Sequence, residues 1–588
     1  MKIKILSIVL LACSSVLLFA QTQDTVVNKS VTVTRDFKPV ITDVGKVITA
    51  PKIVEPSVDK TSPVYSNITT PLSIDYNIHT LPAEELLHGI RPANKGFLRL
   101  GMGLPLNSLA DFMYPILNNE QNRLDVSLHH LGAFVDQKHS KTAASVMYNH
   151  LFSSFDLYAG IGGSHDYFNY YGRPFASLEP FIISDVAGQN RFGSAAYLTP
   201  EMNETTLYNI SGMPLDNTHW RANATVGARS LPLADNLIFD ASLNYRLFNS
   251  VNNKMSENQI HLKGLFEVPF DFNRLGMDIN IYNFIYSGTY GTGFTFPESY
   301  SVIKLNPYYK IVSDDWFLRL GAKTGISIGN AGQIFSPSAD VSAQWNALHD
   351  LLAIYGGVTG DLTVNSWYNI FDENRYMSPQ IRIKDTYTPV DAYLGVKVSP
   401  LYNLLFDLYG QYKVIGNQYF YINRPYERTG TPPADMPESF NKMYHNRFDV
   451  VYSQADRASV GLRASWDYKN QINVYLKGAR HFWNVKDEVK AWHSPNWDVD
   501  FGANVKVIND IAINTHLYFQ DGRYAKLSDA DGTLMTPVLD WNLGASYAYR
   551  DWLSVFARVN NILNKKYEFY RGYQVQGINM MVGAAFSF

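Results

Sequence analysis

Two adjacent histidines, His129 and His130, are the residues whose types best suit acid–base or nucleophilic chemistry in this sequence. Successive side chains point to opposite faces of a strand, so only one of the pair can face an interior if this segment is extended. A hydrolase would also need a nucleophile and an orienting acid, and the spacing of the sequence supplies neither. The sequence therefore predicts a protein that is not an enzyme and needs no cofactor.

A second candidate is the stretch Asp529-Ala530-Asp531-Gly532, which is similar to part of a calcium-binding loop. The later ligands of such a loop are missing. Asp and Gly are also the residues that solvated turns use. We therefore expect a surface turn here and no metal site.

Aromatic residues with arginines nearby form a third kind of candidate site, in two segments expected to be surface loops. Such side chains could hold a sugar or a peptide by stacking and hydrogen bonds. They could also form an interfacial belt or a lid packed on itself, and we favour these alternatives because Tyr and Trp concentrate at membrane boundaries. The candidate ligand contacts are Trp367, Tyr368, Tyr419, Phe420, Tyr421 and Arg424, with Arg375 and Arg428 nearby.

The elements that must position these residues are strands with one apolar face, as the end of the chain shows. Large apolar side chains alternate there with small or polar ones, a period of two. One face of such a strand can meet lipid and the other a lumen. The first face holds Ile578, Met580, Val582, Ala584, Phe586 and Phe588; the second holds Gly577, Asn579, Met581, Gly583, Ala585 and Ser587.

The connections between the predicted strands alternate in length, as in a barrel with turns on one side and surface loops on the other. Tight connections are expected at 550–552, 508–510, 467–470, 400–403, 347–350, 313–315, 269–273 and 231–235. Long polar loops are expected between them at 521–536, 484–495, 418–456, 364–388, 328–335, 288–300 and 249–257.

The positions of the strands are harder to assign in the first half of the barrel. We expect strands at 96–104, 109–117, 123–134, 141–151 and 155–167, then one long excursion from about 168 to 218, in which residues 189–198 could also pair. No later run of roughly 18 apolar residues offers a spanning helix. Inward faces carry charges such as Asp498 and Asp500. The fold class is therefore all-β, a wide transmembrane antiparallel β-barrel of about 22 strands.

Composition agrees with a membrane barrel. The 588 residues include 39 Tyr, 33 Phe and 10 Trp, and two aromatic girdles would use many of them. The formal net charge of −3 gives no basic surface of the kind that nucleic acids require. Outer-membrane lipids are therefore expected as partners, and nucleic acid is excluded.

The N-terminus has the pattern of a secretory signal peptide over residues 1–20, with Lys2 and Lys4 before an apolar stretch and Ala20 at its end. The only cysteine, Cys13, lies in a sequence similar to a lipoprotein cleavage site. The apolar region continues past it, so we favour the first interpretation. Residues 21–95, punctuated by prolines, are expected to form an extended periplasmic segment, and residues 96–588 the barrel.

Residues 560–567, Asn-Asn-Ile-Leu-Asn-Lys-Lys-Tyr, resemble the N-N-L-F-N-K-K-Y stretch in the penultimate strand of TonB-dependent outer-membrane receptors. The last strand of that family also ends in an aromatic residue. The resemblance implies an integral barrel in the outer membrane of a Gram-negative bacterium. Residues 21–95 are too short for the family's plug domain, which is missing or reduced here.

A short stretch near the mature N-terminus, Asp24, Thr25, Val26 and Val27, looks like a TonB box, the segment to which the energising protein TonB adds a strand. The alternative is that these are ordinary strand-forming residues near a terminus. TonB and other envelope proteins are therefore candidate partners.

Two functions from different classes remain open. The family resemblance and the charged lumen predict a receptor-like or porin-like barrel that transports a solute across the outer membrane. The missing plug favours a non-transporting structural or assembly component of an outer-membrane complex. In either case the closing strand predicts an assembly signal at Phe586 and Phe588, read by the barrel-assembly machinery; the alternative is that both are interfacial aromatics.

Overall fold

A computed structural model of the protein describes residues 96–172, 175–176, 182–184, 190–192, 215–231, 237–270, 273–289, 298–329, 335–348, 351–401, 403–425, 443–469, 471–526 and 532–588. The predicted signal peptide (1–20) and the N-terminal segment (21–95) lie outside these residues. The candidate TonB box, Asp24 to Val27, and the candidate calcium-loop residues Asp529 and Asp531 lie outside them as well.

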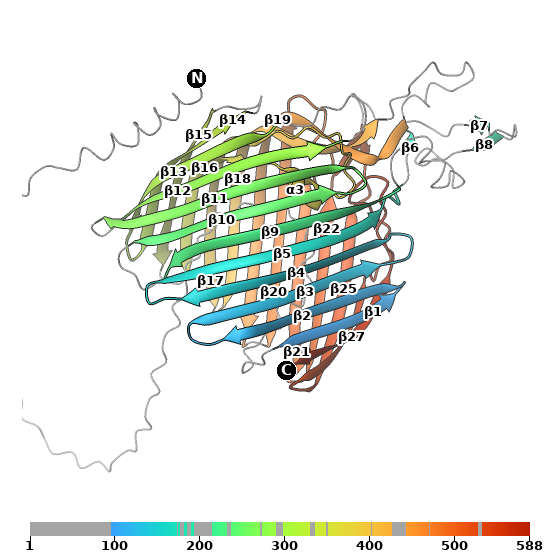
Figure 1. The fold of residues 1–588 in the computed structure, drawn as a ribbon, viewed down its shortest axis with the longest axis horizontal. Coiled ribbons are helices and arrows are strands. Elements are labelled where there is room, and N and C mark those ends of the chain that lie inside the picture. Colours follow the sequence, from blue (N-terminus) through green and yellow to red (C-terminus); the bar gives the residue numbers. More distant parts are fainter. Residues whose placement is uncertain are drawn as a thin grey trace, which may run out of the picture. The chain divides into compact units, whose positions relative to one another are not determined.

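The described residues form one antiparallel sheet that closes on itself into a barrel of 22 strands (Figure 1). Neighbouring barrel strands in the chain pair with each other, and the first strand pairs with the last. The predicted fold class and strand number are thereby confirmed. The barrel strands are β1 (Phe97–Leu104), β2 (Asn107–Asn118), β3 (Asn122–Ala133), β4 (His139–Leu151), β5 (Phe155–Asn169), β9 (Asp216–Ser230), β10 (Ile238–Ser250), β11 (Met255–Phe270), β12 (Asn273–Gly288), β13 (Tyr300–Val312), β14 (Trp316–Ile328), β15 (Phe335–Leu348), β16 (Leu352–Thr363), β17 (Thr386–Leu401), β18 (Leu404–Pro425), β19 (Met443–Tyr468), β20 (Ile472–Val485), β21 (Trp497–Ile508), β22 (Ile511–Asp521), β25 (Val538–Arg550), β26 (Leu553–Asn560) and β27 (Asn579–Ser587).

Short elements lie in the long connections. The strand β6 (Phe175–Ala176) pairs with the start of β19, β7 (Ile182–Ser184) pairs with β8 (Asn190–Phe192), and β23 (Tyr524–Lys526) pairs with β24 (Gly532–Leu534). The helix α3 (Trp367–Glu373) follows β16. Within the described part of the chain, no helix has the length and apolar character needed to cross a membrane.

Alternation along β27 exposes the predicted apolar row on the outer face. Met580 and Val582 are 48% and 54% exposed, while Met581 between them is 6% exposed. Met581 packs on the lumen side against Leu109 and Phe556. The assignment of the two faces of the closing strand is therefore confirmed.

The barrel closes where β27 pairs with β1. Gly583 lies at a close approach of the two strands, because a Cβ atom there would collide with the carbonyl oxygen of Leu100. Beyond the ladder, Gly96 and Phe588 exchange two backbone hydrogen bonds. The two ends of the barrel sequence therefore meet at the same rim.

The two rims differ as the sequence predicts, except that the long loop predicted at 249–257 is a tight turn, since β10 ends at Ser250 and β11 begins at Met255. We call the rim that holds Gly96 and Phe588 the short-turn rim, because the tight connections lie there, for example between β13 and β14 and between β25 and β26. The opposite rim, with the long connections, is the long-loop rim. The long excursion after β5 ends where β9 begins, close to the predicted position.

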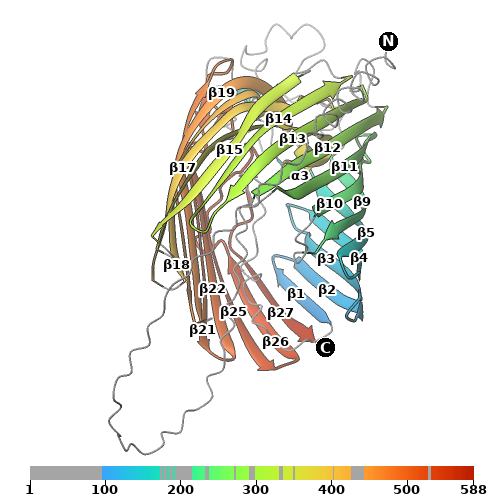
Figure 2. The ribbon, with the colours of Figure 1, turned by 90° about the vertical axis from the view of Figure 1, so that its left-hand side faces the viewer.

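The wall of the barrel is uneven in height. The strands β18 and β19 have 22 and 26 residues, whereas β1 and β26 have 8 each. Figure 2 shows β18 and β19 rising well above the upper ends of β1 and β27. The predicted loop 418–456 is therefore wrong over residues 418–425 and 443–456, which are strand.

This correction moves four predicted loop residues onto a strand. Tyr419, Phe420, Tyr421 and Arg424 all lie on β18. Above the membrane this strand has protein on both faces, so large side chains point both ways and the alternation of apolar with polar residues disappears. The segment consequently has the composition of a loop without the conformation of one.

Candidate functional site

The lumen wall below the long-loop rim is lined by paired charges, most of them on neighbouring strands. Arg319 donates from Nε to Asp340 at 2.7 Å, and its Nη2 lies 3.3 Å from Asp278. Lys323 also pairs with Asp340, at 3.2 Å. Charged side chains of this kind favour a lumen filled with water over one packed with apolar side chains. Further pairs are Arg99–Asp111, Arg229–Asp156, Lys263–Asp240, Lys413–Asp391 and Arg463–Asp407.

Tyrosines lie flat against this wall over glycines. The ring of Tyr308 occupies the place that a side chain at Gly276 would need, and its hydroxyl donates to Glu267 at 2.6 Å. The guanidinium of Arg319 lies 3.4 Å from the centre of the same ring. Flat rings leave the lumen wider than projecting ones would. The same arrangement recurs in Tyr158 over Gly227, Tyr355 over Gly395 and Tyr475 over Gly502, with hydroxyls donating to Asp240, Asp407 and Asp500.

The histidine pair divides between the two faces of β3, as expected. His129 contacts Asp111 on the lumen side. His130 hydrogen-bonds with Ser108 at 2.9 Å and with Thr142 at 2.8 Å. The pair therefore does not act as a unit.

A serine, a histidine and an aspartate do come together elsewhere, which spacing in the sequence did not indicate. His481 lies between the hydroxyl of Ser459, at 2.8 Å, and the carboxylate of Asp498, at 2.5 Å. Ser459 and His481 are each 2% exposed, so neither presents a reactive atom to the lumen. These contacts tie β19, β20 and β21 together. The described residues also contain no group of three or more His, Cys, Asp or Glu side chains that could hold a metal ion.

The long-loop rim is closed first by the segment 364–385, which holds α3. Ser366 begins the helix by accepting a hydrogen bond from the Asn369 N–H at 3.2 Å. Glu257 on β11 accepts from the Trp367 N–H at 2.6 Å. The N–H groups of the first turn of a helix have no carbonyl partner within the helix. Here a carboxylate of the barrel wall accepts the hydrogen bond from one of them.

The helix and its flanking residues bury a continuous apolar group against the upper ends of the strands. We call this group the mouth cluster, because it lies at the long-loop end of the lumen, where α3 sits within the ring of strands (Figures 1 and 2). Its buried members are Phe248, Met255, Phe284, Tyr286, Tyr300, Val302, Leu362, Trp367, Ile370, Phe371, Met377, Ile381, Tyr421, Phe448 and Tyr573.

A second segment, 561–578 between β26 and β27, meets the first from the other side. The rings of Tyr376 and Tyr573 stack with centres 3.6 Å apart. The hydroxyl of Tyr570 donates to the carbonyl of Glu373 at 2.7 Å. Gly572 turns the segment with φ +93°, a value that L side chains rarely adopt. Two loops from distant parts of the chain therefore close on each other.

Ion pairs fix the first loop to the wall. Arg375 lies 3.3 Å from Asp166 on β5, and Asp372 lies 3.5 Å from Arg221 on β9. Burial alone would lower the pKa of Arg375, but Asp166 and other neighbours outweigh it and the net shift is upward. Arg375 therefore stays charged within the closed mouth.

The segment 486–496 supports the mouth from behind β18. His493 donates from Nδ1 to the carbonyl of Tyr421 at 2.7 Å, and its Nε2 accepts from the Arg571 N–H at 3.3 Å. These two partners fit a neutral ring. Burial lowers the pKa of His493 to about 3. Trp492, which is 1% exposed, packs against Phe420 on the same side.

All six predicted ligand contacts lie in or beside the closed mouth. Trp367 and Phe420 are 0% and 1% exposed, so a solute could reach Trp367 only after the loops separate, and Phe420 only after Trp492 moves away. The remaining four are tied by specific contacts. Tyr421 belongs to the mouth cluster, Tyr368 lies under the guanidinium groups of Arg221 and Arg246, Tyr419 donates to Glu373 at 2.7 Å, and Arg424 donates to Ser378 at 2.7 Å.

Several residues that build the mouth were not found from the sequence. Glu257 and His493 carried no local signal, because each acts on a segment far away in the chain. The second loop did carry one, since Tyr567, Phe569, Tyr570 and Tyr573 place four aromatic side chains close together. The density of aromatics in this stretch could have marked it as a second closing segment.

Comparisons with known proteins concern the fold. No protein-family model and no curated protein matches the chain. A mutant of the ferric enterobactin receptor PfeA from Pseudomonas aeruginosa superposes with a TM-score of 0.57 at 12% identity, over 84% of this chain and 80% of that one. The ferripyoverdine receptor of the same organism, bound to ferripyoverdine, gives 0.58 at 13% identity, over 85% and 72%. The copper transporter OprC gives 0.57 at 12% identity, over 84% and 80%.

These solved structures are TonB-dependent receptors, so the barrel of this chain has the fold that the resemblance at residues 560–567 implied. At such identities the likeness extends to the fold and not to a ligand.

Proposed function

We propose that this chain transports a polar solute across the outer membrane of a Gram-negative bacterium, through a barrel whose mouth is closed at rest. The observation that carries the proposal is a lumen lined by paired charges beneath a mouth closed by side-chain packing, hydrogen bonds and ion pairs. The long-loop rim faces the environment and the short-turn rim faces the periplasm. The solved neighbours are named as receptors for ferric enterobactin and ferripyoverdine and as a copper transporter. For this chain we propose only a broader class of ligand, a polar solute.

The closed mouth suits gated transport because every contact in it is reversible. The two closing loops meet through the Tyr376–Tyr573 stack and the Tyr570–Glu373 hydrogen bond. Stacked aromatic pairs and single hydrogen bonds are each worth on the order of 1 kcal/mol. A solute that binds the open form more tightly could therefore shift the loops apart.

Energy for opening would come through the N-terminal segment. We propose that Asp24, Thr25, Val26 and Val27 form the strand that TonB extends by β-augmentation. Deleting these four residues is expected to abolish energised uptake while leaving the amount of barrel in the membrane unchanged. Unchanged uptake by the deletion variant would remove TonB from the proposal.

Conductance across a planar lipid bilayer tests the gate. The full chain is expected to conduct rarely, whereas the double variant Tyr376→Ala/Tyr573→Ala opens more often and for longer. Phe239→Ala, on the outer face of β10, is the control and should behave as the unmodified chain does. A double variant that folds, as judged by its heat-dependent mobility in electrophoresis, and yet never conducts would contradict transport through this lumen.

The second candidate is a structural or assembly component of an outer-membrane complex. The tall wall formed by β18 and β19 favours it, since this hairpin extends far beyond the length needed to span a membrane. A silent barrel that leaves native membranes with a stoichiometric partner would support this function over transport. Shortening the hairpin above residue 418 should then release the partner.

A further inference from the structure

The outer face of the barrel carries a polar row just below the long-loop rim, across β5 and β9 to β12. Cross-strand pairing puts His165 opposite Trp220, Trp220 opposite Asn249, Asn249 opposite Ser256, and Ser256 opposite Ser287. Trp220 is 51% exposed. Side chains of these residues share the outer face because each strand alternates and direct partners lie on the same side.

The rows beneath this one become apolar step by step. One step further from the rim lie Ala222, Leu247 and Asn258, and beyond them the outer face presents Ile260, Leu262 and Leu243, each 42% to 46% exposed. Polar groups at a rim above an apolar band mark the depth at which lipid head groups meet acyl chains. A molecule held here would therefore be polar at one end and apolar at the other.

Lys254 stands at the upper edge of the row. It occupies a left-handed position in the turn between β10 and β11, with φ +48°, and its side chain is exposed. The neighbouring turn is fixed by the hydrogen bonds from the Lys254 N–H to the Val251 carbonyl and from the Thr289 N–H to the Lys254 carbonyl. Among the described residues no carboxylate forms an ion pair with Lys254, and its side chain borders a hollow on the outer face.

Lys254 and the polar row border a hollow of 860 Å³. Its wall includes Trp220, Asn249, Ser256, Ser287 and, on the apolar side, Leu247. The hydroxyls of Ser256 and Ser287 lie 2.7 Å apart, and since only one of them can donate to the other, one hydroxyl hydrogen is left to donate outward.

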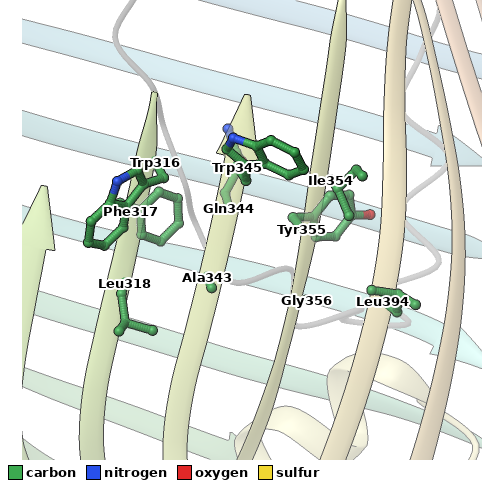
Figure 3. Close-up of a pocket in the computed structure, with 10 residues that line it drawn as sticks. All are labelled: Trp316, Phe317, Leu318, Ala343, Gln344, Trp345, Ile354, Tyr355, Gly356 and Leu394. Atoms are coloured by element: carbon green, nitrogen blue, oxygen red, sulfur yellow. The ribbon is translucent and has the colours of Figure 1, made fainter. Parts of the chain in front are cut away.

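A second hollow on the outer face shows the contrast. It lies on β14 to β17 toward the short-turn rim and measures 460 Å³. Figure 3 shows Trp316 and Trp345 side by side above Leu318 and Ala343, with Gly356 and Leu394 continuing the lower row. No ammonium, hydroxyl or amide of an outward side chain borders this hollow. Its chemistry suits acyl chains alone.

We infer that the hollow at Lys254 binds a phosphorylated glycolipid of the leaflet that faces the long-loop rim. An ammonium group, a free hydroxyl hydrogen and an amide are donors for phosphate oxygens. An exposed indole offers a flat face to a sugar ring. The apolar surface of Ala222 and Leu247 continues below and accepts acyl chains. The inference requires a barrel that spans a bilayer and is independent of whether the barrel transports.

The test is native mass spectrometry of the full-length barrel in phosphatidylcholine nanodiscs. Diphosphoryl lipid A is added as the probe, with its dephosphorylated form and inorganic phosphate as separate arms. One tightly bound diphosphoryl glycolipid per barrel is expected. Lys254→Gln should weaken that binding roughly tenfold, the usual loss for one charge-assisted hydrogen bond. Lys254→Arg keeps the charge and should bind nearly as the unmodified chain does.

Trp345→Leu, in the apolar hollow, is the matched control and should leave glycolipid binding unchanged. Heat-dependent mobility in electrophoresis confirms that each variant is folded. Equal binding of the phosphorylated and dephosphorylated glycolipids, or equal binding by Lys254→Gln and the unmodified chain, would overturn the inference. Displacement of the glycolipid by millimolar inorganic phosphate would also overturn it, because the site would then recognise a small anion without its lipid.

Discussion

The mouth and the lumen wall of this barrel are built by opposite means. The mouth is closed by buried aromatic side chains from loops, with Trp367 0% exposed at its centre. The wall is held by the backbone ladder and lined by ion pairs such as Arg319–Asp340 that remain in contact with the lumen. The packed side chains of the mouth can separate while the rest of the molecule stays folded. The backbone hydrogen bonds of the barrel, in contrast, hold the wall together even when one ion pair is lost.

The largest effect is expected from changes at the end of β27, because this strand belongs to the wall and also follows the mouth segment 561–578. Deleting Ser587 and Phe588, or changing Phe588→Asp, should leave unfolded protein in the periplasm, because we propose that the assembly machinery reads the end of this strand. Losing the one aromatic side chain of Phe588 from the rim would otherwise cost only a few kcal/mol. Fractionation of membranes measures the result, with Phe239→Ala as the tolerated control. Terminal variants that reach the membrane as that control does would make Phe586 and Phe588 purely structural.

Removing the central ring of the mouth should open it without unfolding the barrel. Trp367→Ala is expected to cost the closed mouth about 3–5 kcal/mol, the usual loss for a fully buried aromatic side chain. Hydrogen exchange of residues 364–385 measures this loss, while the strands keep their protection. Trp345→Ala, on the lipid face, is the matched control. Equal exchange in the two variants would mean that burial of Trp367 does not hold the loop.

Acid should loosen one side of the mouth and tighten the other. His493 has a folded pKa of about 3, so its contribution is complete above the unfolded value of 6.5 and is lost as the pH falls below it. At pH 5 the loss is about 2 kcal/mol. Asp385 ends the first closing segment and accepts hydrogen bonds from the Asn365 N–H and the Tyr300 hydroxyl. Burial raises the pKa of Asp385 to about 6, so its contribution is complete below the unfolded value of 3.8 and is lost as the pH rises through 6.

Hydrogen exchange at pH 7 and pH 5, corrected for the intrinsic rates, separates the two effects. Residues 486–496 should exchange faster at pH 5, and residues 380–385 should exchange more slowly. His493→Gln removes the first change and serves as its control. The same direction of change in both segments would show that the mouth opens as a single unit.

The smallest effect is expected in the wall. Arg319→Ala removes two ion pairs and the contact with Tyr308, but the groups remain accessible to the lumen, so the barrel should lose about 1 kcal/mol of unfolding free energy. Arg319→Lys keeps the charge and should lose less. Urea unfolding in detergent measures both. A loss of free energy as large as that of Trp367→Ala would mean that the ion pairs of the wall are shielded from water as fully as the side chains of the mouth.

The wall could be predicted from the sequence because each of its strands carries the signal locally. Alternation places Asp498 and Asp500 inward and Trp497 and Val499 outward without reference to any other strand. The turns between strands carry their own signal in Gly, Asn and Asp. The ion partners across the wall could not be named, since they depend on register between strands.

The mouth could not be predicted in the same way, because its contacts join distant segments. Glu257 caps a helix that begins 110 residues later, and Tyr376 stacks on Tyr573 from a loop near the other end of the chain. The predicted contacts Trp367 and Tyr421 were recognised by composition alone. Composition marks such residues as aromatic and interfacial, and only the fold shows that they pack on one another.

The backbone hydrogen bonds between Gly96 and Phe588 have a consequence for the connectivity of the chain. They join the first and last residues of the barrel. Every neighbouring pair of barrel strands is therefore linked through the chain except β27 and β1, which are held together by hydrogen bonds alone. A circular permutant that is linked there and cut at another tight connection, such as the one between Val312 and Trp316, would keep every strand pair of the ring. It would differ only in which seam closes last, and in ending on a strand other than β27.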